Sequence, residues 1–200
     1  MRCGASPVKS SEARHLILVK HATPQVDVEV PAHQWRLSHG GTAGAAALAD
    51  RLRAAHYAPT KIVASLEPKA TQTGSIIAER LRLPFATVEG LHEHDRRAAG
   101  FLRSEVFAAR MRDLFANPDA VVFGNESASA ALARFTKAVD QVVSEEAGDV
   151  VVVSHGTVMS LFVASRAHVD ASELWGRLGL PAYVSLELPN HRIVEIVAAL

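Results

Sequence analysis

The stretch VVVVSHGT, residues 150–157, decides the fold class. Four consecutive β-branched apolar residues that end in small and polar ones are typical of a strand buried on both faces of a parallel sheet. A second run of this kind, HLILVKHAT at residues 15–23, also ends in a histidine followed by a small residue. Both runs therefore predict buried strands that lead directly into a histidine.

Segments of strand character and helix character alternate along the rest of the chain. Further strands are expected at residues 61–64 and 83–88, helices at 40–56, 68–82, 103–116, 126–146, 157–166 and 170–178, and a terminal hairpin at 183–188 and 193–197. This alternation predicts an α/β fold, a three-layer sandwich with a central, mainly parallel sheet. Residues 1–13 are small and polar and are expected to form a loose tail, with residues 14–200 as a single domain.

Composition narrows the classes of function. The 200 residues carry 21 basic and 21 acidic side chains, so there is no basic excess of the kind that nucleic-acid binding requires. A single cysteine, Cys3, cannot form a disulfide within the chain. The sequence has no apolar stretch approaching a membrane span and no run typical of a signal peptide. We therefore expect a cytoplasmic protein with no nucleic-acid or membrane partner.

The ends of the predicted strands are the place to look for a ligand site, because ligands bind beyond the carboxyl ends of parallel strands. His21 and His155 each follow a strand, Lys20 precedes His21, and the loop after residues 61–64 carries Ser65 and Lys69. These side chains should meet at one edge of the sheet. On a chain with a formal net charge of zero, they form a local cationic pocket.

Such a pocket suits a small phosphorylated substrate. Gly156 lets backbone approach a ligand closely and begins a helix whose N–H groups favour an anion. An imidazole is a phosphoryl acceptor when its reactive nitrogen is neutral and the other nitrogen is held by a hydrogen bond. The hydroxyls of Ser65 and Thr23 are further candidates for phosphate contacts, although each equally suits a local turn.

At these positions the sequence resembles the histidine phosphatase superfamily, in its phosphoglycerate-mutase-like branch. Lys20-His21-Ala22 matches the family's Arg-His-Gly or Arg-His-Ala signature, and Ser154-His155-Gly156 matches its late Ser/Thr-His-Gly. Residues 64–73 match Ser-Ser-x-x-x-Arg-Ala-x-Gln-Thr, with Lys69 at the arginine position. Residues 91–93 match the Leu-x-Glu segment that supplies the family's acid, Glu93 here. The segments at 35–41 and 124–127 also resemble family helix entries, and all of these motifs occur in the family's order.

The resemblance implies a metal-independent phosphomonoester hydrolase that needs no cofactor. His21 would attack phosphorus and become phosphohistidine, while Lys20, Lys69 and His155 hold the phosphoryl oxygens. Glu93 would protonate the leaving alcohol and then activate water.

Both signature arginines are lysines here, which keeps the charge but loses the rigid bidentate fork. One alternative is therefore a weak or inactive phosphatase-fold module that binds a phosphorylated ligand. A phosphomutase is a second alternative, and the short segments between the first motifs and after Glu93 favour hydrolysis over it. His92 and His94 with Asp95 also suggest a metal site, but their spacing is not that of a helical zinc motif. The sequence predicts neither the identity of the substrate nor the oligomeric state.

Overall fold

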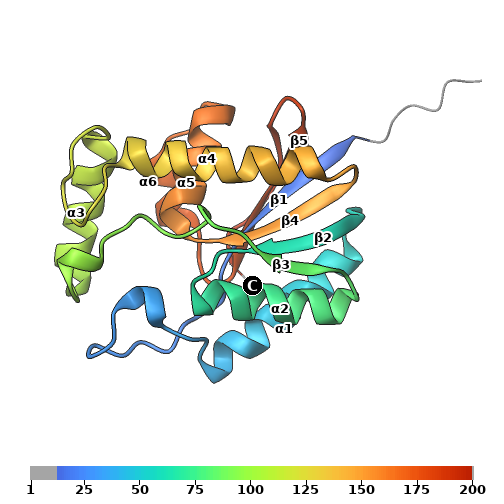
Figure 1. Ribbon diagram of the computed structural model, residues 1–200, viewed down its shortest axis with the longest axis horizontal. Helices are drawn as coiled ribbons and strands as arrows, with labels where there is room; N and C mark the ends of the chain where they lie inside the picture. The colour runs from blue at the N-terminus through green and yellow to red at the C-terminus, as the bar shows by residue number, and fades with distance from the viewer. Residues whose placement is uncertain (1–12, 200) are drawn as a thin grey trace, which may run out of the picture.

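The computed structural model describes residues 13–199 (Figure 1). The predicted loose tail therefore lies, except for its last residue, outside the described residues. The strands are β1 (Arg14–Lys20), β2 (Pro59–Ala64), β3 (Phe85–Thr87), β4 (Asp149–Ser154), β5 (Ala182–Leu188) and β6 (Arg192–Val197). The α-helices are α1 (His39–Ala54), α2 (Pro68–Leu81), α3 (Ser104–Ala116), α4 (Ala128–Glu145), α5 (Gly156–Ala167) and α6 (Ala171–Arg177). Short 3₁₀ helices span Ala32–Gln34 and Arg97–Ala99.

The six strands form one sheet in the order β3-β2-β4-β1-β5-β6. Strands β3, β2, β4 and β1 are parallel, while β5 runs antiparallel to β1 and β6 antiparallel to β5. The predicted mainly parallel sheet is confirmed, and the predicted terminal hairpin supplies its two antiparallel strands.

Side chains of the central strands point alternately into two apolar cores, as the two-residue period of a strand requires. In β1, Leu16 and Leu18 pack with the residues of α4 and α5, whereas Ile17 and Val19 pack with those of α1 and α2. Figure 1 shows these two pairs of helices on opposite sides of the sheet. The predicted three-layer sandwich is thus confirmed, and it explains why residues 16–19 of β1 and 150–153 of β4 are all apolar.

Local signals in the sequence fix where several helices begin. The side chains of Ser38, Ser127 and Asp170 each accept a hydrogen bond from the backbone N–H three residues further on. Each of them therefore caps the helix that follows it. No helix within residues 13–199 combines the length and the apolar character needed to cross a membrane.

The loop after β1 is held against α1 by a close backbone contact. A Cβ atom built on Gly41 would lie 2.0 Å from the carbonyl oxygen of Thr23. Only glycine permits this approach. The contact holds the start of this loop against the start of α1.

Candidate active site

Strand register brings the two predicted histidines together. Lys20 pairs with Ser154 in the β1–β4 ladder, so His21 and His155 are the next residues on two neighbouring strands. Their ring centroids lie 5.2 Å apart, and the backbone N–H of His21 donates to the carbonyl of Ser154 at 3.0 Å. The prediction that both histidines lie at one edge of the sheet is confirmed.

The side chain of His21 is held as a neutral imidazole. Its Nδ1 lies 2.8 Å from the carbonyl oxygen of Ala22, and because a carbonyl only accepts, Nδ1 carries the proton. Burial, followed by the charge of Lys69, lowers the pKa of His21 to about 4. At neutral pH, Nε2 therefore keeps its lone pair, which is the form a nucleophilic imidazole needs.

His155 lies beneath His21 and is fully buried. Its Nε2 is 3.0 Å from the hydroxyl oxygen of Ser65, which explains the place of this serine in the site. Burial and the charge of Lys69 lower the pKa of His155 well below its ordinary value. His155 is thus a neutral hydrogen-bonding group here and does not add a charge to the pocket.

Lys20 lies against the first residue of α5. Its Nζ donates to the carbonyl of Leu178 at 2.6 Å, which leaves two of the three ammonium protons for a ligand. A Cβ atom on Gly156 would lie 3.0 Å from Cε and 3.2 Å from Nζ of Lys20. The glycine therefore makes room for the lysine as well as for any ligand.

Lys69 is almost fully buried at the start of α2. Its Nζ donates to the carbonyl of Ala32 at 2.8 Å and forms an ion pair with Glu67. Glu67 also accepts the backbone N–H of Glu93 at 3.0 Å and lies 3.7 Å from Nε2 of His155. Sequence reasoning gave Glu67 no role, although it lies inside the motif at residues 64–73. The cationic pocket thus contains a carboxylate that was not expected.

Glu93 caps helix α5. Its carboxylate accepts from the backbone N–H and the hydroxyl of Thr157 at 3.2 and 3.1 Å, and from the N–H of Val158 at 3.4 Å. Burial disfavours the charged form of Glu93, but the charge of Arg96 and the N–H of His94 outweigh this effect and lower the pKa to about 2. The expected free N–H groups of this helix are therefore occupied, at Thr157 and Val158, by a protein carboxylate.

Arg96 is a second residue of this cluster that the sequence analysis does not single out. Its guanidinium lies 3.4 Å from Glu93 Oε2 and 4.9 Å from the ring centroid of Phe107. It lines the same cleft as Lys20, His21 and Lys69. The cleft therefore holds a guanidinium after all, supplied by the segment that follows Glu93.

Two further predictions concern residues outside this cluster. Thr23 is exposed, and its hydroxyl donates to the carbonyl of Leu180 at 3.2 Å, so it serves the loop and does not line the cleft. His94 is buried with Nε2 2.8 Å from the carbonyl of Glu126, while Asp95 pairs with Arg97. Within residues 13–199, no group of three or more potential ligand side chains is arranged to hold a metal ion.

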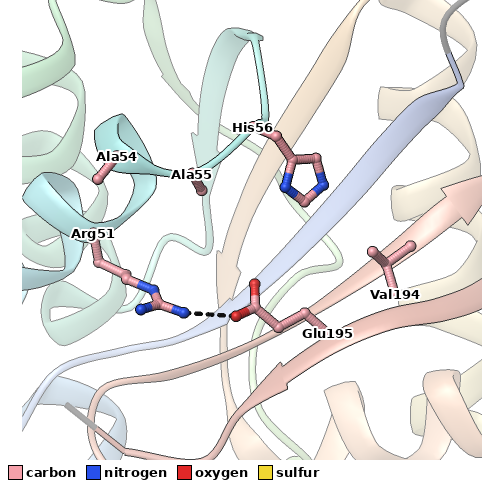
Figure 2. A pocket seen from close by; sticks show the side chains of 6 residues that line it. All are labelled: Arg51, Ala54, Ala55, His56, Val194 and Glu195. Atoms are coloured by element: carbon pink, nitrogen blue, oxygen red, sulfur yellow. Dashed lines mark hydrogen bonds and ion pairs between the residues drawn. The ribbon is translucent and has the colours of Figure 1, made fainter.

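A smaller pocket of about 370 Å³ lies at the opposite edge of the sheet (Figure 2). Arg51 of α1 and Glu195 of β6 meet there in an ion pair of 2.7 Å, beside His56. The hydroxyl of Tyr183 also donates to Glu195 at 2.7 Å. Arg51 and Glu195, the charged residues of this pocket, therefore pair with each other.

The order and spacing of the site residues match a known family over almost the whole chain. The profile of the histidine phosphatase superfamily (branch 1) matches residues 16–194. The chain belongs to the histidine phosphatase superfamily. A comparison with curated protein sequences found no match.

Several solved structures share the fold of this chain. A mycobacterial glucosyl-3-phosphoglycerate phosphatase is 21% identical with a TM-score of 0.72, over 94% of this chain and 100% of the other. A putative α-ribazole-5′-phosphate phosphatase from Escherichia coli is 17% identical with a TM-score of 0.69, over 94% and 97%. A phosphoserine phosphatase variant from Entamoeba histolytica, in complex with phosphoserine, is 15% identical with a TM-score of 0.69, over 92% and 96%. At these identities the likeness establishes the fold alone.

Proposed function

We propose that this protein is a metal-independent phosphomonoester hydrolase that works through a phosphohistidine formed on His21. The observation that carries the proposal is the neutral imidazole of His21, whose Nδ1 proton is held by Ala22 and whose Nε2 is left for attack. Membership of the histidine phosphatase superfamily supports the same reaction.

In the first step, Nε2 of His21 attacks phosphorus and the bond from phosphorus to the alcohol oxygen breaks. Lys20, Lys69 and His155 donate to the three peripheral oxygens, where the charge of the transition state is spread. The leaving alcohol takes a proton from Glu93. A bound phosphoryl dianion opposes ionisation of this carboxyl and so raises its pKa above the low value of the free protein.

In the second step, a water molecule attacks the phosphohistidine. The Glu93 carboxylate takes the proton from this water, inorganic phosphate leaves, and His21 returns to its neutral form. Because α5 and Arg96 hold Glu93 ionised, the free protein already has the protonation state that this step needs. The geometry thus favours Glu93 most strongly as the base of the second step.

The decisive experiment is hydrolysis of p-nitrophenyl phosphate in the presence of a chelator. We expect wild type to turn over and His21→Ala to lose about a thousandfold or more in kcat, since the phosphohistidine cannot form. His56→Ala is the matched control, because His56 is an exposed histidine at the opposite edge of the sheet. Rapid quenching should trap a phosphoenzyme that is labile in acid and stable in base.

Each other outcome selects a different function. Full activity of His21→Ala contradicts the proposal. Vanadate binding by wild type without turnover, with turnover gained in the Lys20→Arg/Lys69→Arg variant, identifies a phosphate-binding module. Transfer of the phosphoryl group to a second hydroxyl in place of water identifies a phosphomutase.

A further inference from the structure

The cleft above His21 is much larger than a phosphoryl group. Its volume is about 840 Å³, within the range of roughly 300–1,000 Å³ that holds whole organic ligands. Its walls come from the loop after β1 and from the segment between β3 and α3, with Leu66 and Trp175 added from elsewhere. Most of this space is therefore left for the group to which the phosphate is attached.

Large apolar side chains stand exposed in the walls of this cleft. Val28, Leu66 and Phe101 are 57%, 55% and 53% exposed, and all three line it. Exposed apolar side chains that gather around one concave site indicate a binding surface for an apolar group. These three residues come from separate segments of the chain, so the fold, and not closeness in the sequence, gathers them around the cleft.

The wall formed by α3 and α6 is aromatic and rigid. The ring centroids of Phe107 and Trp175 are 6.0 Å apart, and Phe115 supports Trp175 from 6.1 Å. Arg96 covers the ring of Phe107. Phe107 and Trp175 pack edge to face, and such packing holds an apolar surface in place before a ligand binds.

Several polar side chains of the walls are already paired within the protein. The indole N–H of Trp35 donates to the carbonyls of Asp27 and Val30 at 2.9 and 2.8 Å. The carboxylate of Asp95 is held by Arg97. The indole N–H and this carboxylate therefore already have partners within the protein, which makes them poor partners for the hydroxyls of a sugar.

We propose that the substrates are phosphate esters of large apolar alcohols, aromatic or long-chain aliphatic. The phosphoryl group lies on the cationic floor at His21, and the apolar group lies against Val28, Leu66 and Phe101. This inference rests on the proposed hydrolase function. It differs from the polar sugar and amino-acid esters named for the relatives of known structure.

Alkyl phosphates test the inference without changing the chemistry of the leaving group. Ethyl and n-hexyl phosphate release primary alcohols of similar acidity, so their kcat/KM values differ through binding of the chain. We expect n-hexyl phosphate to exceed ethyl phosphate by about tenfold or more, from the burial of additional methylene groups. Glycerol 3-phosphate should not exceed ethyl phosphate.

Variants of the cleft wall test the same inference, with a neighbouring valine outside the cleft as the control. Val28→Ala and Phe101→Ala should each reduce the ratio of hexyl to ethyl kcat/KM by about threefold or more, because each removes part of the wall. Val26→Ala should leave the ratio unchanged, since Val26 is on the same loop, is 51% exposed and does not line the cleft.

Phosphonates keep this inference separable from the proposed function, because they bind without turnover. Calorimetry should show n-hexylphosphonate binding about tenfold or more tighter than ethylphosphonate. Equal affinities, or faster hydrolysis of glycerol 3-phosphate than of hexyl phosphate, overturn the apolar substrate class even if the protein is a hydrolase. No turnover of any ester counts against the hydrolase, and the ratio of phosphonate affinities then decides the inference by itself.

Discussion

At the scale of single residues, the site depends on keeping two histidines uncharged. Burial penalises an imidazolium, and Lys69 adds repulsion, so His21 and His155 are neutral in the folded protein. An unfolded chain exposes both rings to water, where their pKa returns to about 6.5. The same burial that prepares the nucleophile therefore makes the fold sensitive to acid.

This sensitivity gives a first prediction. Below pH 6.5 the exposed imidazole of His21 in the unfolded chain takes up a proton, whereas the same ring in the folded protein stays neutral down to about pH 4. The free energy of unfolding therefore falls as the pH falls across this window. The loss from His21 is on the order of 3 kcal/mol at pH 4. Urea denaturation from pH 4 to 8 measures it. His21→Gln should flatten the curve, and curves of the same slope for both proteins contradict the prediction.

A second prediction concerns Glu93, which is needed as a base after the phosphoenzyme has formed. With p-nitrophenyl phosphate the leaving phenol is acidic and needs little protonation, so Glu93→Gln should still form phosphohistidine. The second step should slow by about a hundredfold or more. Quenched-flow kinetics should show a burst of nitrophenolate and a phosphoenzyme that accumulates. Glu89→Gln, a change at an exposed carboxyl outside the cleft, should behave as wild type. Loss of the burst in Glu93→Gln would contradict the prediction, because it would show that the first step needs Glu93 even when the leaving group is acidic.

At the scale of elements, the site is set by where α5 begins. Gly156, its first residue, leaves room for Lys20, and the next two N–H groups hold Glu93. One helix end thus positions a cation and an acid–base group at the same time. Sequence periodicity predicts the helix, but the occupant of its N-terminus depends on a loop more than sixty residues earlier in the chain.

Gly156→Ala is the third prediction. The added Cβ would lie 3.0 Å from Lys20 Cε, so the ammonium must move and the affinity for inorganic phosphate should fall by about tenfold. Gly176→Ala is the matched control, because a Cβ atom on this helical glycine meets nothing within 4 Å. Calorimetry with inorganic phosphate compares the two variants. Equal phosphate affinities for the two variants would show that the space Gly156 leaves for Lys20 does not matter for phosphate binding.

At the scale of the whole molecule, the cleft joins distant parts of the chain. Lys20 near the start of the chain donates to Leu178 near its end, and His21 lies over His155. Strand β5 makes this possible, because it pairs with β1 along its full length and brings the end of α6 to the site. A ligand that bridges these groups should therefore stabilise the fold as a unit.

Ligand-linked stability is the fourth prediction. Inorganic phosphate at a hundred times its dissociation constant should add about 2.7 kcal/mol to the free energy of unfolding, in a single transition. Lys20→Met should lose most of this increment at the same phosphate concentration. Lys61→Met should keep it, because Lys61 pairs with Glu146 outside the cleft. An increment that survives in Lys20→Met contradicts the assignment of Lys20 to the phosphate site.

The sequence by itself determined the sheet, the helices and the edge at which the histidines meet. Runs such as residues 16–19 and 150–153 are apolar throughout and bounded by polar residues, a pattern typical of a strand buried on both faces. Strand polarity then places His21 and His155 at one edge without any further information. Both features depend on residues that are neighbours in the sequence, and the sequence therefore predicts them.

Only the tertiary structure decided how the charges are distributed. Lys69 donates to the carbonyl of Ala32, Glu67 accepts from the backbone N–H of Glu93, and Lys20 donates to the carbonyl of Leu178. These contacts join segments far apart in the sequence, so only three-dimensional proximity creates them. The same holds for the apolar walls, where Val28, Leu66 and Phe101 meet although they lie far apart in the sequence. Electrostatic and apolar interactions depend on distance and burial, so their balance in the site exists only once the chain has folded.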